Sequence, residues 1–160
     1  MTTPEPVAQR IVLRQATTAD ADAISALVCG LTGRWIAVDC TPEGAARLLQ
    51  LLAPGPTAGR LAVGYRYALA ERGQTLVGVA ALRLPTHLYH LFVAEAVQRQ
   101  GLARHLWQTV QAWVDPPAPV TVNASRYALE VYRKLGFEAT GPERSEHGIV
   151  FTPMRWRPPG

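Results

Sequence analysis

The stretch His90-Leu-Phe-Val-Ala-Glu-Ala-Val-Gln-Arg-Gln-Gly-Leu-Ala-Arg104 carries the strongest structural signal in this chain. It reads as an apolar strand, a short connection and a glycine-bearing turn that opens an amphipathic helix. Such an arrangement aims backbone N–H groups and a helix N-terminus at one anion. Gly101 and Ala103 have little or no side chain, so a phosphate can approach the main chain closely. We therefore expect a phosphate-bearing ligand at residues 98–104.

The composition indicates one globular domain over residues 1–160, because 48% of the residues are hydrophobic and only 18% are charged. No apolar run approaches the roughly 20 residues of a membrane span, and no signal-peptide pattern opens the chain. Cys29 and Cys40 have no other metal-ligating residues at a suitable spacing, which favours reduced thiols, no bound metal and a cytoplasmic location. The net charge of +4 suits an anionic ligand. Without a basic cluster, we do not expect nucleic-acid binding.

Before the turn, the pattern predicts a strand at 10–14 and a helix that begins near Thr17. A second helix begins at Thr41-Pro42-Glu43 and ends at the Ala53-Pro-Gly-Pro56 segment. Strands are expected at 61–70 and 76–84, joined by a turn at 71–74, and a third strand at 88–94.

After the turn, Leu102 and the apolar residues that follow it at helical spacing predict an amphipathic helix. A buried strand is expected at 120–122, a helix that starts at 123–125, and a final strand pair near 137–140 and 149–156. Gly136 is placed to end the second helix in the left-handed conformation. The order of elements indicates a mixed α/β sheet with helices on its faces.

A second motif makes the interpretation of the turn more specific. It is Asn-Ala-Ser-Arg-Tyr-Ala-Leu-Glu-Val-Tyr-Arg-Lys-Leu-Gly-Phe at residues 123–137. The turn and this motif together resemble the GNAT superfamily of acetyl-CoA-dependent N-acetyltransferases, and the resemblance covers residues 10–156. It implies the GNAT acyl-CoA N-acyltransferase fold, a mostly antiparallel central sheet that splays beside the cofactor strand, with helices on both faces.

The resemblance also implies which residues hold acetyl-CoA. Backbone amides of the turn would bind the pyrophosphate, and main-chain groups of the preceding strand would pair with the pantetheine arm and polarise the thioester. Asn123 would bond the pantetheine amides. The implied cofactor-binding residues are Leu91, Phe92, Val93, Gln98, Arg99, Gln100, Gly101, Leu102, Ala103, Arg104 and Asn123.

The catalytic assignments have alternatives. The resemblance makes Tyr132 the acid that protonates the departing thiolate, but Tyr132 also fits a core position. Asn123 also fits a helix N-cap. For the base, His90 and Glu71 are candidates beside a water chain or no dedicated base.

For the acceptor, Trp35, Glu71 and His147 are candidate contacts. We expect transfer of acetyl from acetyl-CoA to a primary amine by direct attack, with no metal. The alternative is a non-catalytic acetyl-CoA sensor or partner module. The acceptor, a small molecule or a peptide, stays open, and a homodimer follows by analogy only. No membrane partner is expected.

Overall fold

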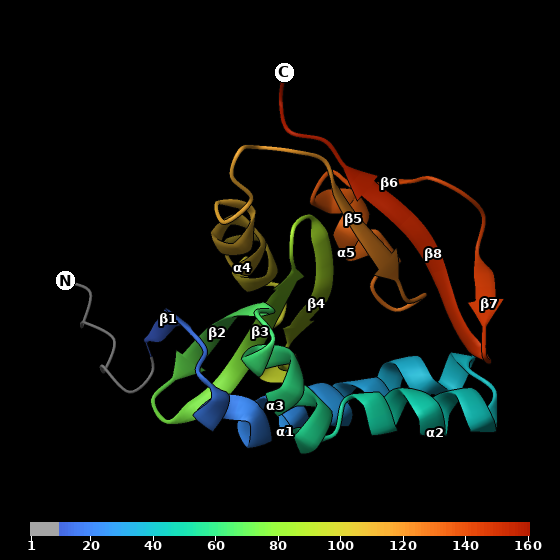
Figure 1. Cartoon of the computed structure of the whole chain (residues 1–160), viewed down its shortest axis with the longest axis horizontal. Helices are drawn as coiled ribbons and strands as arrows, with labels where there is room; N and C mark the ends of the chain where they lie inside the picture. Colours follow the sequence, from blue (N-terminus) through green and yellow to red (C-terminus); the bar gives the residue numbers. More distant parts are fainter. Residues whose placement is uncertain (1–9) are drawn as a thin grey trace.

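The computed structural model describes residues 10–160 of the chain (Figure 1). The first nine residues of the expected domain 1–160 lie outside the described residues. Eight strands form an open mixed sheet in the order β1-β2-β3-β4-β5-β8-β6, and β7 pairs with β8. The strands are β1 Ile11–Gln15, β2 Arg66–Arg72, β3 Thr75–Arg83, β4 His87–Val93, β5 Val120–Ala124, β6 Glu138–Ala139, β7 Arg144–Glu146 and β8 Ile149–Trp156.

Helices cover both faces of this sheet. The α-helices are α1 Ala21–Leu31, α2 Pro42–Leu51, α3 Pro54–Ala62, α4 Leu102–Gln111 and α5 Leu129–Lys134. Short helical turns are η2 Thr18–Asp20, η3 Thr32–Ile36, η4 Ala37–Asp39 and η5 Glu95–Val97, of which η3 is a π-helix. The mixed fold with helices on its faces confirms the fold expected from the sequence.

The sheet opens between β4 and β5. All strand pairs are antiparallel except β4 with β5, which run parallel and pair only at His87 with Thr121 and Leu88 with Val122. Beyond Leu88 the two strands diverge, as Figure 1 shows. The far edge of β4 therefore leaves its backbone groups without a strand partner on the β5 side among the described residues, although β3 pairs with its other edge.

Two hydrophobic clusters fill the two faces. On one face, α4 contributes Leu106 and Val110 and α5 contributes Tyr132, which pack with buried residues of the central strands. On the other face, Ile24 and Val28 of α1 pack with the opposite side of β2 and β3. Because β4 lies between the clusters, its alternate side chains face different neighbours.

The structure corrects three boundary predictions. The Ala53-Pro-Gly-Pro56 segment does end α2, but Pro54 then occupies the first turn of α3, where its missing N–H costs nothing. The expected strand at 61–70 therefore begins only at Arg66. The helix expected from 123–125 begins at Leu129, since Asn123 still belongs to β5. Asn123 is therefore not a helix N-cap.

One helical stretch also changes an expectation from composition. Residues Thr18–Asp39 form a continuous helical run of 22 residues that is long and apolar enough to cross a membrane, by length and composition only. Its residues Ile24 and Val28 are buried against the sheet. Core helices pass the same length test, so this run is weak evidence for a membrane span.

Candidate active site

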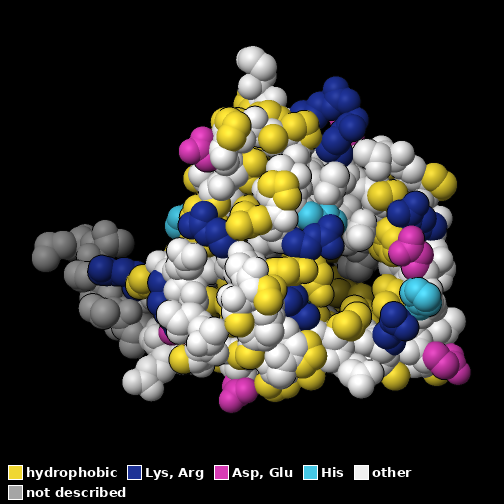
Figure 2. All heavy atoms as spheres, in the orientation of Figure 1, with side chains coloured by type: hydrophobic (Ala, Val, Ile, Leu, Met, Phe, Trp, Pro, Cys, Tyr) yellow, Lys and Arg dark blue, Asp and Glu magenta, His cyan; other side chains and the backbone are white. Residues whose placement is uncertain are grey.

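A cavity of about 780 Å³ opens where β4 and β5 diverge. Figure 2 shows this region as a hollow with hydrophobic side chains inside it. One group of lining residues comes from β4, the α4 turn, β5 and α5, and we call this part the α4 slot: Leu91, Val93, Val97, Gln98, Arg99, Gly101, Leu102, Ala103, Arg104, Asn123, Ser125, Tyr127, Ala128, Val131, Tyr132, Lys134 and Leu135.

The other group comes from α1, η3, α2, β4, β7 and β8, and we call this part the α2 chamber. Its residues are Leu31, Thr32, Ile36, Arg47, Leu48, Leu51, Leu52, Tyr89, His90, Phe92, Glu146, His147, Ile149, Val150 and Phe151. The slot and the chamber meet at β4, which supplies residues to both.

The turn before α4 is open toward the slot. Gly101 is left-handed, with φ of +81°, and a Cβ placed on it would meet no atom within 4 Å. Arg99 also has a positive φ of 64°. The first amides of α4 follow directly, and no carbonyl of the helix itself can reach them. This cradle of amides, with free space above Gly101, fits a phosphate group.

Two polar side chains of the turn stabilise the protein around the slot. Gln98 Nε2 donates to the Val93 carbonyl oxygen and to the Tyr127 hydroxyl, each at 3.0 Å. Arg104 donates to the Lys134 carbonyl oxygen at 2.9 Å, so it joins α4 to the end of α5. The turn is therefore held in place from both sides.

A bulge in β4 sets the directions of its side chains. Ala81 pairs with His90 and Leu82 pairs with Leu88, so Tyr89 is an extra residue on β4. As a result Leu88 faces one cluster, whereas His90 faces the chamber beside Phe92. Leu91 and Val93 pack toward the α4 side.

His90 is 5% exposed and lies among aromatic rings, with the Tyr89 ring centroid 4.4 Å and the Phe92 ring centroid 5.4 Å away. Burial lowers the pKa of His90 to about 3, because desolvation disfavours the charged imidazolium. The imidazole is thus neutral near pH 7. A neutral imidazole offers one nitrogen that donates a hydrogen bond and one that accepts.

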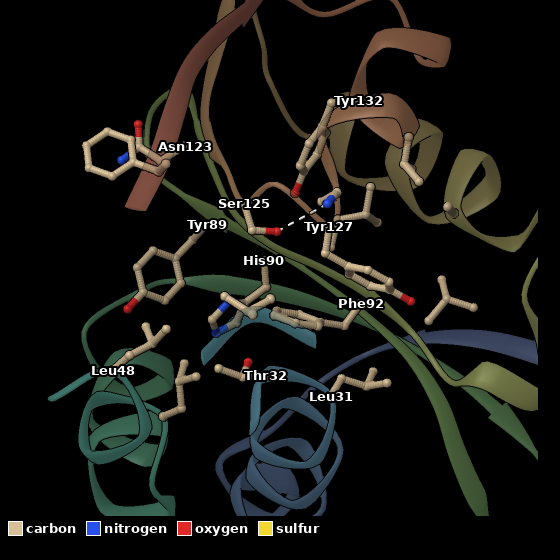
Figure 3. Close-up of a pocket in the computed structure, with 18 of the residues that line it drawn as sticks. Leu31, Thr32, Leu48, Tyr89, His90, Phe92, Asn123, Ser125, Tyr127 and Tyr132 are labelled. Atoms are coloured by element: carbon tan, nitrogen blue, oxygen red, sulfur yellow. Dashed lines mark hydrogen bonds between the residues drawn. The ribbon is translucent and has the colours of Figure 1, made fainter. Parts of the chain in front are cut away.

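Tyr132 reaches the junction of slot and chamber from α5. Its ring packs against Phe137 with centroids 5.4 Å apart, and only 5% of the residue is exposed. Figure 3 shows its hydroxyl pointing into the space above His90 and Phe92. Desolvation raises the pKa of Tyr132 above its usual value, which keeps the hydroxyl protonated. A protonated hydroxyl can donate to an atom in the slot.

Asn123 lies on β5 and lines the slot, next to Ser125, whose hydroxyl accepts a hydrogen bond from the Ala128 amide at 3.2 Å. This small turn ends the strand and precedes α5. Val122 and Ala124 of β5 pack into the cluster of α4 and α5, so Asn123 lines the cavity from the opposite face of the strand, above Tyr89 in Figure 3.

Trp35 lies outside the lining but closes one edge of it. Its ring stacks on Tyr127 with centroids 5.4 Å apart and an interplanar angle of 7°. Trp35 Nε1 also donates to Glu95, whose carboxylate accepts from Arg34 at 2.7 Å as well. The stack joins η3 to the loop after β5, so the two halves of the sheet are bridged beside the cavity.

The structure separates the remaining candidates. His147 lines the chamber, in the turn between β7 and β8. Glu71 does not line the cavity, and its carboxylate instead pairs with Arg14 of β1. Gln100 is also outside the lining. No group of three His, Cys, Asp or Glu residues that could hold a metal occurs between residues 10 and 160.

The sequence pattern singled out few individual residues of the chamber. Leu48 and Leu51 of α2, with Leu52 at its C-terminal end, line the cavity. Thr32 had no signal beyond its place next to a helix. It is 1% exposed, and its Oγ1 has no hydrogen-bond partner among the described residues.

Comparison with known proteins agrees with this geometry. The profile of the "Acetyltransferase (GNAT) domain" family matches residues 36–158. No curated protein sequence matches the chain closely enough to assign it. Among solved structures, a GCN5-related N-acetyltransferase from Rhodopseudomonas palustris has 22% identity and a TM-score of 0.76, covering 91% of this chain and 94% of its own.

Two further similar structures are described with a coenzyme. PaiA N-acetyltransferase from Thermoplasma acidophilum, in complex with coenzyme A, has 12% identity and a TM-score of 0.76, and the match covers 92% and 99% of the two chains. YncA from Salmonella typhimurium, with its cofactor acetyl-CoA, has 17% identity and a TM-score of 0.64, with 92% and 94% covered. The family profile spans most of the chain, and the chain belongs to the GNAT family of acetyltransferases.

Proposed function

We propose that this protein is an N-acetyltransferase that moves the acetyl group of acetyl-CoA to a primary amine by direct attack. The observation that carries the proposal is the continuous cavity that leads from the amide cradle at Gly101, past the unpaired edge of β4, to the Tyr132 hydroxyl. The similar structures that hold coenzyme A or acetyl-CoA support this choice of donor.

The residues of the slot fit a coenzyme A molecule. The diphosphate would lie on the amides of the α4 turn, where Gly101 leaves space and Arg99 adds positive charge. The pantetheine arm would pair with the β4 backbone at Leu91 to Val93 in place of a neighbouring strand. Asn123 would bond an amide of the arm from the opposite side of the slot.

The acetyl transfer needs no covalent enzyme intermediate. The amine lone pair forms a C–N bond to the thioester carbon, the C–S bond breaks, and the sulfur leaves with its electron pair. A backbone amide of β4 stabilises the oxyanion. Tyr132 donates its proton to the sulfur, and the proton that the nitrogen loses goes to water, from which Tyr132 is reprotonated.

His90 lies where an acceptor amine would meet the donor, at the border of slot and chamber. With a pKa of about 3, it is a weak proton acceptor near neutral pH. We therefore assign His90 a hydrogen bond to the amine, and the amine enters the reaction in its neutral form. Cytoplasmic location and a homodimer belong to this proposal by analogy with related enzymes.

The experiment measures CoA release with a thiol reagent while amines are added to the protein and acetyl-CoA. We expect release that depends on the amine, and a drop in turnover of about 10²–10⁴-fold in the Tyr132→Phe variant, with coenzyme A binding unchanged. Tyr65→Phe is the matched control, because Tyr65 lies outside the lining. Acetyl-CoA binding without amine-dependent release would instead favour the sensor.

A further inference from the structure

The α2 chamber is lined by one buried hydroxyl, by apolar side chains and by charged residues, and these three features describe the acceptor. Thr32 Oγ1 is buried without a hydrogen-bond partner among residues 10–160. Thr32 begins the π-helix η3, and π-helical turns are frequent at functional sites. Buried hydroxyls nearly always have a partner, so this one points to a ligand atom.

The position of Thr32 suits the reacting nitrogen. Figure 3 shows its hydroxyl directed from η3 toward His90 and Phe92, on the side of the cavity opposite Tyr132. A neutral primary amine has two N–H donors and one lone pair. Thr32 Oγ1 and the neutral His90 ring can each accept one N–H, which leaves the lone pair free for the thioester carbon.

The middle of the chamber is apolar. Leu48 and Leu51 of α2, Leu52 at its C-terminal end, and Phe92 and Phe151 of the sheet line it. Leu51 is 43% exposed, so it offers apolar surface that a ligand can cover. A hydrocarbon chain or ring gains from this surface, whereas a sugar ring or a second ammonium group does not.

The rim is not suited to a second positive charge. Arg47 is exposed there and forms no ion pair with any described residue. The one carboxylate in the lining, Glu146, lies 3.7 Å from Arg144. An unpaired guanidinium repels an ammonium group and attracts a carboxylate.

We infer that the acceptor is a monoamine on an apolar body, whose far end is uncharged or carries a carboxylate, and that polyamines and aminoglycosides are poor acceptors. This inference rests on the proposed function. Thr32 and His90 accept hydrogen bonds from the amine, the leucines at α2 pack against the apolar body, and the Arg47 guanidinium lies near the far end of the acceptor.

Three amines of equal chain length test the charge at the far end. Hexylamine, 1,6-diaminohexane and 6-aminohexanoate end in a methyl group, an ammonium group and a carboxylate. We expect kcat/KM for the diamine to be at least about tenfold below that of the other two. In Arg47→Glu the order of the diamine and 6-aminohexanoate should reverse, and Arg157→Glu, an exposed arginine outside the lining, should keep it.

Thr32 is tested with the same amines. Thr32→Val should lower kcat/KM for all three by about tenfold, the effect of one lost hydrogen bond, while the KM for acetyl-CoA stays unchanged. Thr32→Ser, which keeps the hydroxyl, should restore most of the loss. An unchanged kcat/KM in Thr32→Val would overturn its contact with the amine.

The outcomes separate the two proposals. A diamine that is acetylated as fast as hexylamine would overturn the acceptor inference and leave the acetyltransferase proposal standing. If no amine, including 2-phenylethylamine as an aromatic probe, releases CoA from a protein that binds acetyl-CoA, the proposed function is wrong and the acceptor inference is wrong with it.

Discussion

The buried hydroxyl of Thr32 provides a test in which stability and activity should change in opposite directions. Thr32 is 1% exposed and Oγ1 has no partner among the described residues. Burying a hydroxyl without a hydrogen-bond partner costs about 1–3 kcal/mol. Valine has nearly the same shape, so Thr32→Val removes that cost and keeps the packing.

We therefore expect Thr32→Val to raise the free energy of unfolding by about 1 kcal/mol or more. For a chain of this size, 1 kcal/mol corresponds to about 2–4 °C in Tm. The measurement is urea unfolding without coenzyme A or amine, followed by circular dichroism. The acetylation assay on the same samples should show slower transfer to the amine.

Thr57→Val is the matched control, because Thr57 is equally buried but its hydroxyl is bonded. Thr57 Oγ1 donates to the Ala53 carbonyl oxygen at 2.9 Å and accepts from Arg60 at 3.1 Å. This variant should lose about 1 kcal/mol. If Thr32→Val also loses stability, its hydroxyl is satisfied within the folded protein, and the argument that it awaits a ligand is wrong.

The remaining predictions concern the slot and His90. Gly101→Val should abolish acetyl-CoA binding in calorimetry. Gly64 has a comparable positive φ and open surroundings but lies outside the cavity, so Gly64→Val should bind acetyl-CoA as the wild type does. Equal losses of binding in the two variants would point to backbone strain alone. kcat/KM should rise with pH up to the pKa of the amine, about 10, because only the neutral amine attacks. His90, with a pKa of about 3, stays neutral over this range, so an inflection between pH 6 and 7 would contradict the assignment. Since the native pKa of His90 is below the ordinary 6.5, the unfolded chain takes up the proton first, and His90 alone should lower the free energy of unfolding by about 2 kcal/mol from pH 6.5 to 5, in addition to the contribution of His87. Urea unfolding at pH 6.5 and pH 5 should show that His90→Asn loses about 2 kcal/mol less free energy of unfolding than the wild type does, whereas His147→Asn loses as much as the wild type. Equal losses in the wild type and His90→Asn would exclude this linkage.

Local patterns were sufficient to predict the fold and the turn. The glycine turn before α4, the amphipathic face of α4 and the segment that ends at Gly136 each depend on residues close in sequence, and the GNAT fold predicted from them is confirmed. Gly136 does adopt a positive φ, of 100°. Helix boundaries were less predictable where a proline can either end a helix or begin one, as at Pro54, which follows α2 and begins α3.

The placement of Glu71 could not be predicted in the same way. As a carboxylate in a hairpin next to the cofactor strand, it matched the chemistry of a base. Its side chain pairs with Arg14 of β1, a residue more than fifty positions away, and that pairing depends on the β1–β2 register. Residue type predicts what a group can do, whereas strand order decides where it does so.

The α2 chamber is the part of the cavity that is hardest to predict from this sequence. Leu48 and Leu52 have the spacing of core residues, and nothing in that spacing distinguishes a wall of a cavity from a packed interior. The distinction arises from the bulge at Tyr89, which turns His90 into the chamber, and from the divergence of β4 and β5. A bulge adds a single residue to one strand, so its position depends on the partner strand and leaves no periodic signal. The turn before α4 is therefore predictable from local sequence, whereas the chamber requires the arrangement of the whole sheet.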